Sequence, residues 1–260
     1  MHSQNSKDAV SSVFSICEEA LSRGLGGIAI TDHVDIDSGE ASCRETLDGL
    51  KTDITRARDA FGGRLEISMG MELGEAHHNV PLARDLVSDD CLDFVIGSLH
   101  HVRKSEDYFY IDYDRADMDA LWRNYYEELV EMAEVGCFDV VGHINYQVRY
   151  MTESARARTD LPRYYGTLEN ILKTVIRSGK GIEINTSSLW RGLDFTLPSS
   201  EVIEIYRRAG GKIITTGSDA HDAARVGEAI DDAVKRIASA GFDKFAFFKK
   251  RTPYFHDVRQ

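Results

Sequence analysis

Residues 212–221 read KIITTGSDAH, a β-branched run that ends in an aspartate and a histidine. The same pattern, a β-rich run followed by a residue that binds metal or lies beside one, occurs six times. The six endings are Thr31-Asp32-His33, Gly70-Met71-Glu72, Gly97-Ser98-Leu99-His100, Gly142-His143, Ile184-Asn185 and Gly217-Ser218-Asp219-Ala220-His221. If the runs are parallel strands, their carboxyl ends share one face of the fold and these side chains converge there. The pattern therefore predicts a metalloenzyme.

Segments with helical spacing of apolar residues alternate with the β-rich runs. In the first of them Val13, Cys17 and Leu21 follow Val10 at helical intervals, and Gly24 is a stop signal. Further helices are predicted around residues 47–57, 118–132, 168–176 and 202–209, and strands at 26–31, 65–72, 94–98, 138–143, 181–186 and 212–217. This alternation predicts a parallel sheet covered by helices.

An open doubly wound sheet and a closed barrel both fit the alternation. Ligands contributed by nearly every strand are gathered more easily at the mouth of a barrel, so the α/β barrel is favoured. No linker, charge block or repeat divides residues 1–260, which predicts a single domain. Residues 146–165 lack periodicity and predict a long loop on the catalytic face or an irregular insertion.

The composition limits the classes of partner. With 31 basic and 43 acidic residues the formal net charge is −12, which argues against a nucleic-acid partner or an anionic membrane surface. No apolar stretch approaches the length of a membrane span, and no N-terminal segment has the pattern of a signal peptide, so a cytoplasmic protein is expected. The widely spaced Cys17, Cys43, Cys91 and Cys137 predict reduced thiols.

Each candidate ligand also has a structural interpretation, because a single histidine or aspartate at a strand end is more often a hydrogen-bonded or solvated group. The argument for metal binding rests on number. The residues sharing this position are His33, Glu72, His100, His143, Asp219 and His221. Independent structural roles would rarely produce that regularity. The other histidines, His77, His78, His101 and His256, are predicted to lie on the surface or beside the ligands.

On these motifs, together with His2-Ser3 and Asn5-Ser6-Lys7-Asp8-Ala9 at the start, the chain resembles the PHP (polymerase and histidinol phosphatase) superfamily. Within it, the chain is most similar to the monofunctional histidinol-phosphate phosphatases. The resemblance extends from the first residues to about residue 221. It implies a distorted seven-stranded β/α barrel, TIM-like, that holds up to three divalent metal ions (Zn, Mn or Fe).

The resemblance also assigns roles. Glu72 would bridge two metals, with His2 and Asp219 on one side and His100 and His143 on the other. Asp8, His33 and His221 would hold a third metal. Glu72, Asp219 and His221 are the expected catalytic residues, and Arg149 and Arg191 the expected substrate-binding residues, because a guanidinium can clamp a phosphate.

The chain departs from the family at its N-terminus. The family pattern is a strand ending in His-x-His, whereas this sequence begins Met1-His2, so the first strand and one ligand are missing from it. A misassigned start or a truncation is the favoured explanation, because a barrel without that strand would expose two sheet edges. Asn145 stands where relatives often carry aspartate, which puts a contact behind the ligands in doubt.

The resemblance implies hydrolysis of a small phosphate monoester, most specifically L-histidinol phosphate in histidine biosynthesis. A PHP phosphoesterase acting on nucleotides or another small phosphate ester is the nearest alternative. A metal-dependent amidohydrolase is disfavoured, because none of the six strand ends carries the bridging lysine of that group. A catalytically impaired metal-binding homologue is the alternative outside enzymology. The sequence makes no prediction of oligomeric state.

Overall fold

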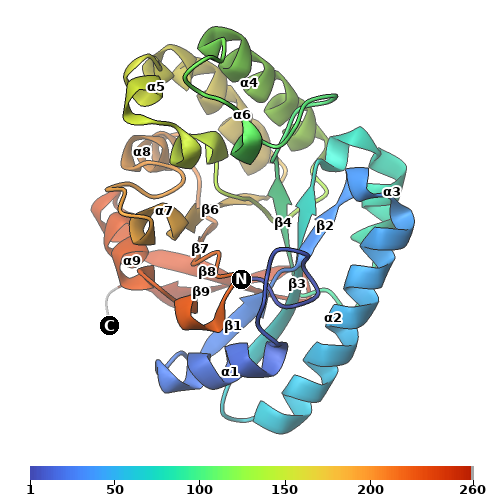
Figure 1. Cartoon of the computed structure of the whole chain (residues 1–260). Helices are drawn as coiled ribbons and strands as arrows, with labels where there is room; N and C mark the ends of the chain where they lie inside the picture. The colour runs from blue at the N-terminus through green and yellow to red at the C-terminus, as the bar shows by residue number, and fades with distance from the viewer. Residues whose placement is uncertain (259–260) are drawn as a thin grey trace.

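A curled parallel sheet forms the centre of the molecule, described here by a computed structural model for residues 1–258. The strands run in the order β1 (Gly27–Ile30), β3 (Glu66–Gly74), β4 (Phe94–Ser98), β5 (Val140–Val141), β6 (Gly181–Asn185) and β7 (Ile214–Gly217), and β2 (His33–Asp35) also pairs with β3. All of these pairs are parallel. The helices surround the curled sheet (Figure 1), so the α/β prediction of a distorted, TIM-like barrel is confirmed.

The main helices are α1 (Val13–Ser22), α2 (Glu40–Phe61), α3 (Val80–Leu86), α4 (Met118–Val135), α6 (Tyr165–Arg177), α8 (Ser200–Arg208) and α9 (Ile230–Ser239). The predicted start of the first helix at Val10 is wrong, because the Ser12 side chain accepts a hydrogen bond from the backbone N–H of Ser15 and caps the helix there. Val10 is exposed. None of these helices has both the length and the apolar character needed to cross a bilayer.

Two connecting regions differ in how closely they follow the prediction. Residues 146–165 are irregular as predicted, built from η4 (Tyr146–Tyr150), the short α5 (Glu153–Ala157) and η5 (Leu161–Tyr164). The strand predicted at 138–143 shrinks to β5, because only Val140 and Val141 pair with both neighbouring strands. The four cysteines are free thiols, as predicted.

An antiparallel hairpin of β8 (Lys244–Lys249) and β9 (Thr252–Asp257), which the sequence analysis did not predict, fills the inside of the curled sheet. Ala246 and Phe248 pack against Phe94, Ile96 and Val140. The rings of Phe94 and Phe248 stack at 5.0 Å between centroids. The hairpin therefore closes the interior below the carboxyl ends of the strands.

The sheet stays open between β1 and β7 within residues 1–258, which agrees with the predicted absence of the first strand. Met1 and His2 bridge this gap at the carboxyl end. The backbone N–H of His2 donates to the Ala220 carbonyl at 2.8 Å, and the N–H of Thr31 donates to the Met1 carbonyl at 2.8 Å. A cavity of about 550 Å³ lies along the gap, lined by β1, β7 and β8. The bridge positions His2 although the strand is absent.

Candidate metal centre

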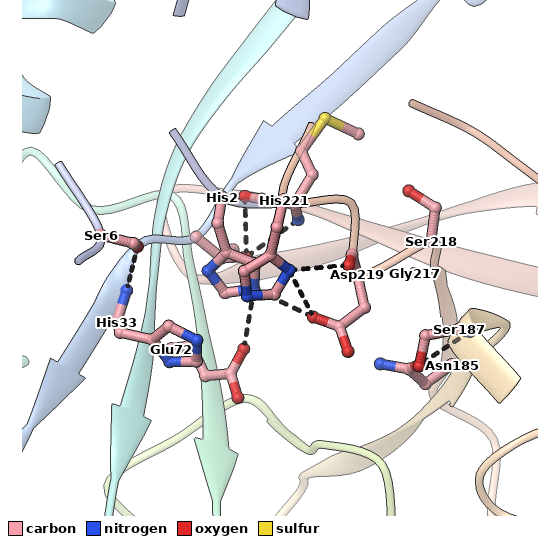
Figure 2. A network of polar contacts seen from close by, with 12 residues as sticks. His2, Ser6, His33, Glu72, Asn185, Ser187, Gly217, Ser218, Asp219 and His221 are labelled. Atoms are coloured by element: carbon pink, nitrogen blue, oxygen red, sulfur yellow. Dashed lines mark hydrogen bonds and ion pairs between the residues drawn. The ribbon is translucent and has the colours of Figure 1, made fainter. Parts of the chain in front are cut away.

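The eight predicted metal ligands lie together at the carboxyl ends of the strands. They are His2, Asp8, His33, Glu72, His100, His143, Asp219 and His221. Figure 2 shows His2, Glu72, Asp219 and His221 directed toward one another, although they come from distant parts of the chain. Parallel pairing produces this convergence, because Glu72 on β3 lies opposite His33 on β2.

The Glu72 carboxylate lies at the centre and divides its two oxygens between two sets of imidazoles. Its Oε1 is 2.9 Å from His100 Nε2 and 2.8 Å from His143 Nε2, and it accepts a hydrogen bond from Ser98 Oγ at 2.7 Å. Its Oε2 is 3.3 Å from His2 Nε2. A carboxylate shared in this way is arranged to bridge two cations.

Two further carboxylates complete the cluster. His2 Nε2 is 3.1 Å from Asp219 Oδ1, so this imidazole faces both Glu72 and Asp219. Asp8 Oδ2 is 3.0 Å from His221 Nε2 and 3.7 Å from His33 Nε2. The His2 ring lies 4.3 Å from the rings of both His33 and His221.

The donor set fits divalent transition metals. Three groups of ligand atoms, each within 4.8 Å of one another, occur here: His2, Glu72 and Asp219; His33, Glu72 and His100; and His2, His33 and His221. Imidazole with carboxylate suits Zn, Fe and Mn. Packing so many imidazoles around one buried carboxylate is costly unless a cation lies among them, because each ring nitrogen then needs a proton or a partner.

The electrostatics of the metal-free protein reflect this crowding. Burial alone would raise the pKa of Glu72, but the neighbouring imidazoles of His33, His143 and His100 hold that pKa well below its usual range. Burial alone would lower the pKa of His2, yet its hydrogen bonds to Asp219 and Glu72 raise it to about 9. A bound cation would replace the proton that His2 otherwise carries.

Asp32 holds the N-terminal loop in place and is not itself a ligand. Its carboxylate accepts hydrogen bonds from the backbone N–H and the Oγ of Ser3 and from Ser6 Oγ. Ser6 Oγ in turn accepts from the backbone N–H of His33 at 2.9 Å. In the sequence Asp32 is distinguished only by its place in the Thr31-Asp32-His33 motif. The pairing of this aspartate with serines far away in sequence is visible only in the fold.

A second network of polar residues lies at the end of β6. Glu183 Oε2 accepts from the Asn185 side chain, and Asn185 Oδ1 accepts from Ser187 Oγ at 2.6 Å. Gly217 leaves room for this arrangement, because a Cβ at that position would lie 2.0 Å from Glu183 Oε1. The buried Glu183 was not among the predicted site residues.

Arg149 reaches the metal cluster, as its predicted role requires. One of its terminal nitrogens donates to Asp219 Oδ2 at 2.7 Å and to Ser187 Oγ at 2.6 Å. The guanidinium stacks over the rings of Tyr146 and Tyr150, and its Nε–H is buried without a partner among residues 1–258. An unused donor on a fixed guanidinium beside a metal site is suited to an anionic ligand.

Arg191 lies farther out, as an exposed residue at the end of α7 (Ser187–Trp190). Its guanidinium lies 4.7 Å from the Trp190 ring and 5.8 Å from the Tyr150 ring. Asn145 is bound to two tyrosines of α4. Its Oδ1 accepts a hydrogen bond from the Tyr126 hydroxyl, and its backbone N–H donates to the Tyr125 hydroxyl. The expected contact at position 145 is thus replaced by an anchor to α4.

Glu75, which follows β3, gives the metal-free protein a testable pH dependence. Burial raises the pKa of Glu75 from 4.5 to about 8, although its Oε1 accepts from the backbone N–H of His100. The unfolded chain releases this proton near pH 4.5, whereas the folded chain keeps it. The contribution of Glu75 to stability is therefore greatest below that pH and falls by up to about 1.4 kcal/mol per pH unit until about pH 8.

We expect Glu75→Gln to remove this loss, because glutamine carries no charge to bury. Urea unfolding of the metal-free proteins should show the variant gaining stability relative to the parent from about pH 5 to about pH 8, and no further gain above that. Glu66→Gln, an exposed position on the same strand, is the control. Parallel pH profiles for Glu75→Gln and the parent would contradict the buried neutral carboxyl.

The PHP domain family matches residues 1–187 of this sequence. The chain belongs to the PHP domain family. A probable histidinol-phosphatase from Deinococcus radiodurans is 26% identical over 238 residues, covering 86% of this chain and 85% of the relative. The histidinol-phosphatase of Lactococcus lactis subsp. lactis is 27% identical over 243 residues, covering 88% and 86%.

The PHP fold is also found among solved structures. The crystal structure of histidinol phosphate phosphatase from Lactococcus lactis subsp. lactis, complexed with zinc, L-histidinol and phosphate, matches this chain with a TM-score of 0.79. The match has 23% sequence identity and covers 98% of this chain and 97% of that chain. At this identity the likeness establishes the fold.

Proposed function

We propose that this PHP domain is a divalent-metal-dependent phosphate monoester hydrolase whose substrate is L-histidinol phosphate. The observation that carries the proposal is the Glu72 carboxylate shared between two sets of imidazoles, with Arg149 beside it. The relatives named as histidinol-phosphatases, which align along most of the chain, support the choice of substrate. The structure in complex with zinc makes zinc the first metal to test, ahead of manganese and iron.

In this proposal the eight clustered histidines and carboxylates hold up to three metal ions, with Glu72 as the shared ligand. Bound divalent ions would supply Lewis acidity: they would lower the pKa of a water and neutralise charge on the phosphoryl oxygens. Glu72, Asp219 and His221 contribute to catalysis by fixing the ligand geometry. Asp219, tied to Arg149, is a poor general acid, because the guanidinium holds the pKa of its carboxyl well below the usual range against the effect of burial.

Arg149 is proposed to bind the phosphoryl group. Its guanidinium is held by Asp219 and Ser187, so little conformational freedom is lost when an anion arrives. Its positive charge, held beside the cluster, would attract the phosphoryl group. Asp219 contacts only one terminal nitrogen of the guanidinium. A negatively charged substrate could therefore still form a hydrogen bond to Arg149.

The pocket above the cluster is suited to the cationic part of the substrate. It has a volume of about 160 Å³, and its charged lining residues besides the histidines are Lys7, Asp8, Asp35 and Asp107. Asp35 lines this pocket, and its side chain is 42% exposed. We propose that Asp35 accepts a hydrogen bond from the substrate ammonium.

This role for Asp35 predicts a change of specificity. Asp35→Asn should lower kcat/KM for L-histidinol phosphate by about fivefold, since a partly exposed charge pair contributes about 1 kcal/mol. Hydrolysis of an uncharged phosphate ester such as phenyl phosphate should change little. Ser38→Ala, at another position lining the same pocket, is the control. If kcat/KM fell equally for both substrates, Asp35 would act on the metal cluster and not on the substrate ammonium.

Arg191 is predicted to make a smaller contribution than Arg149. Its exposed guanidinium lies on Trp190, where solvent screens its attraction for phosphate. We expect Arg191→Ala to raise KM for the phosphate ester about threefold at unchanged kcat. Steady-state kinetics at saturating metal test this, and an unaltered KM would remove Arg191 from substrate binding.

The experiment that tests the function measures phosphate release by the zinc- or manganese-loaded chain. L-Histidinol phosphate, phenyl phosphate and a nucleoside monophosphate are compared, with a chelator-treated sample as control. A strong preference for L-histidinol phosphate is expected. Activity confined to the other esters would support a phosphoesterase but would contradict L-histidinol phosphate as its substrate. Absence of turnover with metal bound would favour a catalytically impaired homologue. The preference for a small substrate over nucleic acid, and the cytoplasmic location, stay predictions.

A further inference from the structure

A second cluster of histidines and carboxylates lies outside the candidate catalytic centre. It joins η2 (Ala76–His78), which follows β3, to helix α4 and to η1 (Ile36–Ser38). His77 and His78 come from η2, Glu128 comes from α4, and Asp37 comes from η1. The side chains of His77 and His78 are buried, with 1% and 6% exposure, so of the two predicted positions, on the surface or beside the ligands, the surface is wrong for them.

The ligand atoms of this cluster converge. His77 Nε2 is 2.8 Å and His78 Nε2 is 2.9 Å from the same oxygen of Glu128, Oε2. The two rings lie 4.4 Å apart at an angle of 63°. Distances of the same size join Glu72 to its imidazoles in the candidate catalytic centre. The second cluster therefore has the same local arrangement as the first.

His78 has the hydrogen-bond pattern of a metal-binding histidine, in which one ring nitrogen is held by a carboxylate and the other is directed at the metal. His78 Nδ1 is 2.7 Å from Asp37 Oδ2, and an ionised carboxylate only accepts hydrogen bonds, so Nδ1 carries the proton. His78 Nε2, 2.9 Å from Glu128 Oε2, is then the nitrogen directed at the centre of the cluster, where a metal ion would be bound. In metal sites a carboxylate commonly accepts a hydrogen bond from the ring nitrogen that does not bind the metal, and this bond fixes the orientation of the imidazole.

We propose that His77, His78 and Glu128 form a separate zinc site, with Asp37 as the residue that positions His78. Two histidines and one glutamate form a ligand set that zinc accepts, with water in the fourth position. Tetrahedral zinc with bonds of about 2.0–2.1 Å separates its ligand atoms by roughly 3.4 Å, so the Glu128 carboxylate must withdraw by about half an ångström. Its side chain is 12% exposed at the surface end of the cluster.

The surrounding charges favour a cation. Asp37 and Glu128 each contribute a negative charge. The guanidinium of Arg103 is 3.8 Å from Glu128, but it lies closer to Glu131, at 2.7 Å. Zinc at this position would tie η1, η2 and α4 together beside His100, because Glu75, which accepts from the backbone N–H of His100, immediately precedes η2.

The test counts zinc in the full chain. Parent and variants are reconstituted with excess zinc and desalted. Zinc per chain is then measured by mass spectrometry, with circular dichroism as a check of folding. Glu128→Gln should lose about one equivalent of zinc relative to the parent. Glu131→Gln, one turn along the same helix and bound to Arg103, should retain the parental number. This readout does not depend on phosphatase activity, so it stands whether or not the proposed function holds.

Asp37→Asn provides a second, milder test, because Asp37 is half-exposed and its replacement leaves the three ligands intact. We expect competition with a chromophoric chelator to show one zinc bound about 10–100-fold more weakly, as for loss of a carboxylate behind a ligating histidine. Parental zinc stoichiometry and affinity in folded Glu128→Gln and Asp37→Asn would overturn the proposal and leave the cluster as an ion pair of His78 with two carboxylates.

Discussion

Glu72→Gln is expected to lower kcat/KM for the phosphate ester by about a thousandfold and to remove zinc from the candidate catalytic centre. Both oxygens of Glu72 face imidazoles, with His2 on one side and His100 and His143 on the other. Glutamine keeps the shape but offers one oxygen and an NH₂ group that repels a cation. Loss of several kcal/mol of charge stabilisation corresponds to a rate change of this size.

Glu66→Gln is the matched control for this prediction. Glu66 lies on the same strand β3, but it is exposed, and its ion-pair partner within residues 1–258 is Lys249, at 3.2 Å. We expect Glu66→Gln to retain the zinc content and activity of the parent. Zinc content measured by mass spectrometry and initial rates of phosphate release give two separate readouts. If Glu72→Gln kept both, the bridging role would be wrong and the imidazoles would serve a structural purpose.

The convergence of six of the eight ligands could be predicted because each of these six follows or ends a β-rich run in the sequence. A parallel strand that is buried on both faces can be recognised in the sequence as an apolar run. Polar residues that directly follow such a run lie at the carboxyl edge of the sheet. His100 after β4 and Asp219 after β7 are found in this way. The loop residue Asp8 has no such coupling, and it was identified through the family resemblance.

The hairpin β8–β9 was missed because its turn has no conventional sequence signal. Lys250 and Arg251 adopt φ values of 46° and 60°, a conformation that hairpin turns usually assign to Asn-Gly. Here tertiary contacts maintain it: the N–H of Lys250 donates to the Asp93 side chain, and the N–H of Arg251 donates to the Asp93 carbonyl. A conformation maintained by a residue more than a hundred positions away cannot be recognised from local sequence.

The supporting carboxylates were missed for a related reason. Glu75 and Glu183 look like ordinary acidic residues in the sequence, yet both are buried within the site. Their burial follows from the packing of neighbouring strands, and it is tolerated because each accepts a backbone N–H, from His100 and His143 respectively. Sequence periodicity reports which face of an element is apolar. It does not report which polar groups the fold places opposite one another.

Arg149→Met is expected to raise KM for the phosphate ester by about 10–100-fold and to weaken inhibition by inorganic phosphate to a similar degree. Among the arginines and lysines of residues 1–258, Arg149 is the one paired with Asp219. Loss of a charge-assisted bidentate contact costs about 1.5–3 kcal/mol, which corresponds to a change of this size. Arg149→Lys should be intermediate, because lysine restores the charge but not the planar fork.

The same substitution separates binding from metal positioning. With zinc bound, the metal compensates the charge of Asp219, so Arg149→Met should leave zinc content unchanged while phosphate inhibition weakens. Without zinc, the substitution leaves Asp219 with no guanidinium partner and no metal. We therefore expect Arg149→Met to lower the midpoint of urea unfolding, relative to the parent, more in the metal-free form than in the zinc-loaded form. Arg163→Met, an exposed arginine that pairs with Asp119, is the control. Unchanged KM and phosphate inhibition with altered zinc content would instead place Arg149 among the residues that position Asp219.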